Sequence, residues 1–347
     1  MDQLFTSILA WINYAFVFGS VLLFGALGET LTEKSGNMNL GIPGTMCIGG
    51  VSGFSAVYLY ELGCTNAGTV PSPFVLVLFA LLFAFLGAAL AGLLFSFLTT
   101  TLRVNQNVTG LTLTIFGVGL SKFIVMVIKP KELTTIRAMA AAPLFSSAPA
   151  DALKDGFWAT PFGEILKTIF LDYGFMFYLS IVLVILAYLF FRYTKAGLSL
   201  RAVGENPATA DAAGINVVLY RYLATVIGSG IAGLGAVYYF LDYNNGLMST
   251  VDISTVETLG WLALALVIFA LWRPLNLLWG AGIFGVCYWL YNYVGAFGLI
   301  LTNWQKPLLE SVPYLVTIVV LIITSLKKKR ENQAPQGLGL SYFREDR

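Results

Sequence analysis

The sequence predicts an all-α polytopic membrane protein, a helix bundle with about nine transmembrane helices. Three observations predict this class. Hydrophobic residues make up 58% of the 347 residues, charged residues only 11%, and the mean hydropathy is +0.80. Many apolar residues lie in continuous runs that approach the ~20 residues a helix needs to cross ~30 Å of hydrocarbon. The runs do not alternate polar with apolar residues, which disfavours a transmembrane β-barrel.

Nine runs reach or approach the length of a span. The first begins without a basic segment or a small-residue cleavage site, so we expect it to remain as a span and not to be removed as a signal peptide. The predicted spans are residues 8–28, 38–60, 74–99, 108–128, 174–192, 218–241, 257–272, 275–295 and 308–326. This predicts a transmembrane domain over 1–330 and a flexible cytoplasmic tail over 331–347, which is polar and contains Gly and Pro.

The basic residues predict the orientation. With nine alternating spans, Lys34, Arg103, the stretch 192–201, Arg273 and the tail Lys327–Arg330 fall on one side. Because Lys and Arg in short loops stay in the cytoplasm, we expect the N-terminus outside and the C-terminus inside.

One predicted external loop, residues 129–173, is an exception to this charge rule. It contains several basic residues, but its length weakens the rule, and its prolines exclude a continuous span. We expect short surface helices there.

Composition excludes several functions. A net charge of +2 without a basic face argues against a nucleic-acid partner. The chain has no histidine and three scattered cysteines, so the usual zinc, haem and Ser-His-Asp sites cannot form. No phosphate-binding loop motif occurs, and no carboxylate lies near the middle of a predicted span. We therefore expect no cofactor, ATP hydrolysis or proton relay in this chain.

A polar segment, residues 192–216, interrupts the apolar runs. Gly204 breaks one helical stretch, Asn206 before Pro207 caps another, and we expect a short helix over 207–213. A short rigid helix outside the membrane, with exposed charges, suits docking of a separate protein. The candidate docking residues are Arg201, Gly204, Glu205, Asn206, Pro207 and Asp211.

A second polar cluster, residues 28–53, passes into a Gly-rich apolar run. Gly41, Pro43 and Gly44 favour a break where the chain enters the membrane. Broken helices within a membrane face a cavity or buried protein, so Asn39 and Gly41 are candidates for contact with a transported substrate. The alternative, weighed equally, is that the glycines only permit close helix packing.

Two further groups complete the candidate substrate path. Asn107 stands at the start of the fourth span, where capping and interfacial solvation are the commoner explanation and a gating contact is the alternative. Gly228, Gly230 and Gly233 lie in the sixth span, where small residues let another backbone approach and leave room for a path.

Several motifs resemble one family. RAVGENPATADAAGINV, residues 201–217, resembles the cytoplasmic coupling segment of bacterial ABC-importer permeases of the ribose, nucleoside and branched-chain amino-acid class. NMNLGIPGTMCIGG, NQNVTG and GWLALALVIFALWRPLNLLWGAGIFG resemble further segments, so the resemblance covers most of the chain. The GENP and PFGEIL…FLDYG sequences look closest to the nucleoside-uptake branch. The chain departs from the class at GIPG, where an acidic G-[LV]-E-G is more usual.

The resemblance implies the membrane-spanning permease subunit of an ATP-driven importer for nucleosides, in a bacterial cytoplasmic membrane. The implied partners are a cytoplasmic ABC ATPase subunit that binds ATP and Mg, a second permease subunit, identical or different, an extracytoplasmic substrate-binding lipoprotein and membrane lipids. One alternative is a permease of the same class for ribose-like sugars. Another is an ion-coupled secondary transporter, which a lack of buried Asp, Glu and His disfavours.

Overall fold

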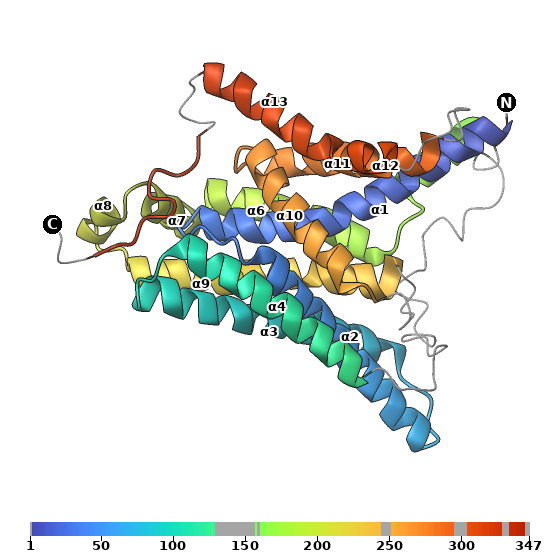
Figure 1. The fold of residues 1–347 in the computed structure, drawn as a ribbon, viewed down its shortest axis with the longest axis horizontal. Helices are drawn as coiled ribbons and strands as arrows, with labels where there is room; N and C mark the ends of the chain where they lie inside the picture. Colours follow the sequence, from blue (N-terminus) through green and yellow to red (C-terminus); the bar gives the residue numbers. More distant parts are fainter. Residues whose placement is uncertain are drawn as a thin grey trace.

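The computed structural model describes residues 2–128, 157, 160–243, 251–294, 304–327 and 333–343. Within these ranges every regular element is a helix (Figure 1). The α-helices are α1 (Asp2–Glu33), α2 (Ile42–Asn66), α3 (Pro73–Ser96), α4 (Gln106–Ile128), α5 (Pro161–Phe170), α6 (Phe175–Tyr193), α7 (Lys195–Glu205), α8 (Pro207–Ala212), α9 (Val217–Tyr238), α10 (Ile253–Phe269), α11 (Pro274–Tyr293), α12 (Gln305–Glu310) and α13 (Val312–Lys327). Short π-helical segments, Phe97–Thr101 and Tyr239–Tyr243, continue α3 and α9.

The predicted class, an all-α polytopic membrane protein, is confirmed. Six helical segments in the described residues are long and apolar enough to cross a membrane: Phe5–Glu33, Ile42–Asn66, Pro73–Thr101, Gln106–Ile128, Phe175–Tyr193 and Val217–Tyr243. They correspond to the first six predicted spans. The last three predicted spans coincide with shorter apolar helices, Ile253–Phe269, Pro274–Leu290 and Pro307–Ile323. A total of nine spans stays a prediction.

Helix α5 falls in the predicted external loop. The Thr160 hydroxyl caps it by accepting a hydrogen bond from the Gly163 N–H at 3.1 Å, and Pro161 occupies the first turn, where a missing N–H breaks no helical bond. A short helix in this loop is therefore confirmed for residues 161–170. Residues 129–156 of the loop lie outside the described residues.

Helix α9 lies at the centre of the bundle and packs against α1, α2 and α3. The apolar core around it includes Phe24, Phe54 and Tyr238, all of which are buried. Small residues bring these helices together, because glycine leaves no Cβ between two backbones. Helix α1 also packs against α10 and α11 and so joins the two halves of the chain.

Charged loops gather at one end of the bundle. Helices α7 and α8 and residues 333–343 lie at this end, and the start of α1 lies at the opposite end (Figure 1). We call α7, α8 and residues 333–343 the polar end. Residues 333–343 belong to the predicted flexible tail, but here they occupy a docked position, with the Gly337 N–H bonded to the Gly204 carbonyl at 2.8 Å. The flexibility of this tail stays a prediction.

Candidate functional site

Helices α7 and α8 form the predicted docking segment. The Asn206 side chain accepts a hydrogen bond from the Thr209 N–H at 3.1 Å, and Pro207 occupies the first turn of α8. The helix ends at Ala212, and Gly214 has a φ of +83°, a left-handed conformation that glycine adopts without steric cost. The short helix predicted over 207–213 is therefore confirmed. Its role in coupling stays a prediction.

The docking candidates divide by exposure. Arg201, Glu205 and Asn206 are exposed, whereas Pro207 and Asp211 are half-buried. Gly204 is buried, and a Cβ added to it would lie 2.2 Å from the Lys34 carbonyl oxygen. The backbone of α7 therefore rests on the residues that follow α1.

A charged cleft of about 540 Å³ lies beside α7. Basic side chains from four places in the sequence line it, with Glu205 as the acidic member. These residues are Lys34, Arg192, Arg201 and Arg273. Burial lowers the pKa of the Lys34 ammonium most, the Arg201 charge lowers it further, and Glu205 opposes the shift.

The cleft joins loops that the charge rule assigns to one side of the membrane. Lys34 follows α1, Arg192 lies in the last turn of α6 and Arg273 precedes α11. Arg103, from the loop before α4, reaches the same end, since its guanidinium carbon lies 4.5 Å from the centroid of the Phe343 ring. These predicted loops therefore do lie together. Which face of the membrane they meet stays a prediction.

A buried polar cluster lies beneath the polar end. The Asn39 side-chain oxygen accepts a hydrogen bond from the Gly41 N–H at 3.0 Å, and the Asn39 N–H donates to the Glu29 carboxylate at 3.1 Å. Asn39 and Glu29 are both fully buried. The structure thus brings Asn39 and Gly41 together, with a carboxylate beside them.

The expectation that no carboxylate is buried was wrong. Glu29 and Glu33 are 0% and 5% exposed, because α1 continues to Glu33 and turns both side chains toward the bundle. Besides the Asn39 N–H on Glu29, the indole N–H of Trp272 donates to Glu33. Their place in the polar cluster of residues 28–53 gave no indication that their side chains point into the bundle.

The segment between α1 and α2, residues 34–41, is tied to two other helices. The Asn37 side chain donates to the Thr225 hydroxyl of α9 at 3.0 Å, and the Met38 N–H donates to the Gln106 side chain of α4 at 2.7 Å. The Thr114 hydroxyl donates to the Leu40 carbonyl at 2.8 Å. These bonds hold the segment in place at the end of the bundle that faces α7.

Asn107 is exposed on α4, and its neighbour Gln106 is the buried residue. Consecutive helical residues point about 100° apart, so a one-residue difference separates the inner face from the outer one. The Asn105 side chain accepts bonds from the N–H groups of Asn107 and Val108 at 3.0 and 3.1 Å, which confirms capping in this cluster. A gating contact of Asn107 stays a prediction.

The three candidate glycines of α9 face close neighbours. A Cβ added to Gly228 would lie 2.3 Å from the Gly28 carbonyl oxygen, and one on Gly230 would lie 2.5 Å from the Phe85 ring. One on Gly233 would lie 2.5 Å from the Ala88 side chain. In this conformation they provide close helix packing, and their place on a substrate path stays a prediction.

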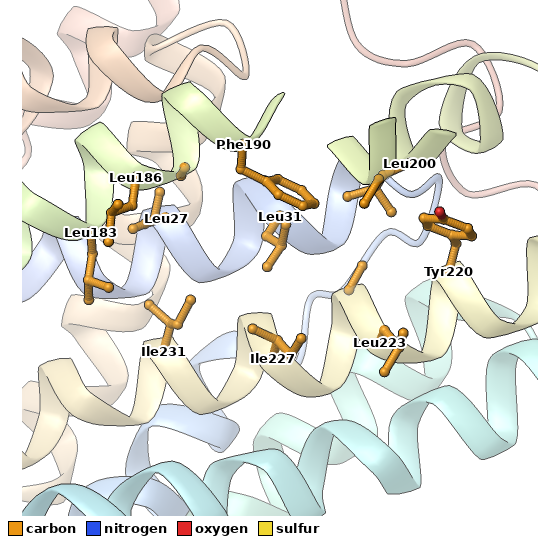
Figure 2. Close-up of a pocket in the computed structure, with 13 residues that line it drawn as sticks. Leu27, Leu31, Leu183, Leu186, Phe190, Leu200, Tyr220, Leu223, Ile227 and Ile231 are labelled. Atoms are coloured by element: carbon orange, nitrogen blue, oxygen red, sulfur yellow. The ribbon is translucent and has the colours of Figure 1, made fainter. Parts of the chain in front are cut away.

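An apolar groove of about 400 Å³ lies between α1, α6, α7 and α9. Figure 2 shows leucine and isoleucine side chains pointing into it from these helices, including Leu183, Leu31 and Ile227, with Tyr220 toward one end. Its lining offers almost no hydrogen-bonding groups, so it suits hydrocarbon and not a polar solute.

The described residues combine membrane-spanning helices, a buried polar cluster and a two-helix segment, α7–α8, outside the spans. The chain belongs to the family described as branched-chain amino acid transport system / permease component, which matches residues 11–325. It is therefore a permease component of an ABC importer, a transport subunit.

Three relatives align with this chain over nearly their whole length. A putative glucose ABC transporter permease, TsgC13 of Haloferax volcanii, is 28% identical over 94% of this chain and 95% of its own. The nucleoside ABC transporter permease NupC of Lactococcus lactis is 29% identical over 94% and 95%. The guanosine ABC transporter permease NupQ of Bacillus subtilis is 28% identical over 94% of both. No solved structure matches the chain.

Proposed function

We propose that this permease imports nucleosides and that a cytoplasmic ATPase subunit drives it from the polar end. The cargo is supported by the relatives named for nucleoside and guanosine transport. The glucose-named relative favours a second candidate, a permease for sugars. Both cargoes carry several hydroxyl groups, which a buried cluster of amides, hydroxyls and carboxylates can bind.

One observation carries the coupling mechanism, the direct contact between Gly204 and the Lys34 carbonyl. Through it the exposed α7–α8 segment touches residues 34–41, which hold Asn39 and Gly41. When ATP binding draws two ATPase subunits together, a push on α8 would move residues 34–41. Their bonds to α4 and α9 would then rearrange, and the cavity would switch between outward- and inward-open states.

The docking surface combines the exposed residues of α7–α8 with the adjoining charged cleft. Arg201, Glu205 and Asn206 offer charges and an amide at the surface, and Pro207 with Gly204 shapes the turn between the helices. The four basic residues that line the cleft support a cytoplasmic position for this end.

Membership of this permease family supports the remaining architecture that we propose. We place nine spans in a bacterial cytoplasmic membrane, with the N-terminus outside and the C-terminus inside. A second permease subunit completes the pathway, an extracytoplasmic lipoprotein delivers the substrate, and the partner ATPase binds ATP and Mg. The path would pass Asn39, Gly41, Asn107 and the glycine face of α9, where Gly228, Gly230 and Gly233 separate from their neighbours in another conformation.

Charge reversal tests the docking assignment. The paired change Glu205→Lys and Asp211→Lys reverses two acidic charges of the docking segment, so we expect the ATPase to stop co-purifying and nucleoside uptake to fall at least about tenfold. The matched control is Glu164→Lys in α5, an exposed glutamate outside the docking segment. If the paired change leaves association and uptake at the control level, the docking assignment is wrong.

The cargo is tested on the complex purified with its binding protein. A ligand raises the melting temperature of the protein that binds it, so we expect nucleosides to raise that of the binding protein. A response to sugars alone would replace the nucleoside assignment with the sugar one. Uptake that continues after ATP depletion in energised vesicles would instead support an ion-coupled transporter.

A further inference from the structure

We propose that Tyr342 and Arg221 are positioning residues for coupling, because they hold residues 333–343 as a strap between α8 and the inner ends of α1, α4 and α9. We call residues 333–343 the C-terminal strap. The proposal rests on the proposed coupling role of α8. It adds a second mechanical link beside the contact of Gly204 with Lys34.

The strap bonds to both parts that coupling must connect. The Tyr342 hydroxyl donates to the Asp211 carboxylate of α8 at 2.9 Å. The Gly337 N–H donates to the Gly204 carbonyl at 2.8 Å, and the Gly339 N–H donates to the Gly36 carbonyl at 3.1 Å. One continuous piece of backbone therefore joins α8, the end of α7 and the segment that follows α1.

Arg221 anchors the strap from the side of α9. This arginine is 1% exposed, and its Nη1 donates to the Leu340 carbonyl at 3.1 Å. Its Nε and Nη2 have no hydrogen-bond partner among the described residues. A buried cation with unsatisfied donors is costly, and water would reach it if the strap lifted. The free-energy difference between the docked strap and the lifted strap is therefore smaller than the contacts of the strap alone suggest.

The strap also packs against side chains. Tyr342 lies against a small apolar cluster that includes Val203 of α7 and Ala210 of α8. At the far end, Phe343 lies beneath the Arg103 guanidinium, which belongs to the loop before α4. A displacement of α8 must therefore either carry the inner ends of three helices with it or release the strap.

The test is Tyr342→Phe in the assembled complex, because it removes one hydroxyl and keeps the ring in its apolar cluster. Losing a hydrogen bond to a carboxylate should speed hydrogen–deuterium exchange over residues 204–212 by about tenfold. Substrate transported per ATP hydrolysed should fall, while the melting temperature and ATPase co-purification remain those of the native protein. The matched control is Tyr193→Phe, an exposed tyrosine at the end of α6.

A second variant tests the same link through the backbone. A Cβ added to Gly337 would lie 2.7 Å from the Gly204 carbonyl oxygen, so Gly337→Ala should push the strap away and raise exchange in the same residues. Unchanged exchange in both variants overturns the strap. Faster exchange with unchanged transport per ATP reduces it to a structural contact and overturns its coupling role. Failure of the native permease to bind an ATPase refutes the proposed function instead, and the exchange result still tests the strap.

Discussion

The contact between α1 and α9 predicts the effect of Gly228→Ala. The new Cβ would lie 2.3 Å from the Gly28 carbonyl oxygen, whereas ordinary contact begins at 3.4 Å, so the two backbones must separate locally by about 1 Å. The obstacle is backbone and cannot rotate away. Overpacking of this kind costs about 1–3 kcal/mol, against a helix-propensity gain of about 1 kcal/mol for replacing glycine by alanine.

A matched control accounts for the gain in helix propensity when alanine replaces glycine. An alanine Cβ at Gly119 of α4 would have nothing within 4 Å of it, so Gly119→Ala gains propensity without a clash. The purified variants are compared by thermal unfolding followed by tryptophan fluorescence. We expect Gly228→Ala to unfold about 1–3 kcal/mol less stably than Gly119→Ala, a difference of several degrees in the midpoint. Equal midpoints would show that the close approach of α1 and α9 does not exist.

Two other predictions concern buried and capping carboxylates. Trp272→Phe removes the indole donor to Glu33 and should cost about 1–3 kcal/mol of unfolding free energy. A double-mutant cycle with Glu33→Leu, which removes the acceptor, should show coupling between the two changes, and additive effects would contradict the bond. Asp252 caps α10 by accepting hydrogen bonds from the Ser254 N–H at 2.9 Å and the Thr255 hydroxyl at 2.6 Å. Burial raises the pKa of this carboxyl, but the hydrogen bonds outweigh burial and hold the pKa below its ordinary value of 3.8. Because the pKa is lower in the folded state, this stabilisation is present above pH 3.8 and is lost as the pH falls through the folded pKa. Asp252→Asn should therefore weaken the fall of the melting temperature at acidic pH. An unchanged fall would exclude this carboxylate as its cause.

Local chemistry accounts for the parts of the site that the sequence could predict. The Asn206–Pro207 pair sets the start of α8, and Gly214 follows its end, because caps and left-handed glycines act within a few residues. The basic loops meet at one end because alternating spans place them there. Gln106 and Glu29 were missed, since polarity alone does not show which side of a helix faces the bundle.

The amino-acid sequence was sufficient to predict an all-α membrane protein, the places of its first six apolar spans and the short capped helix that interrupts them. These properties depend on hydrophobic length and on neighbours along the chain. Three contacts are visible only in the folded bundle: α1 and α9 meet at Gly28 and Gly228, Glu29 bonds to Asn39, and the strap returns to α8. Each of these joins residues whose contact depends on how helices rotate and pack against one another, and no local pattern specifies that rotation.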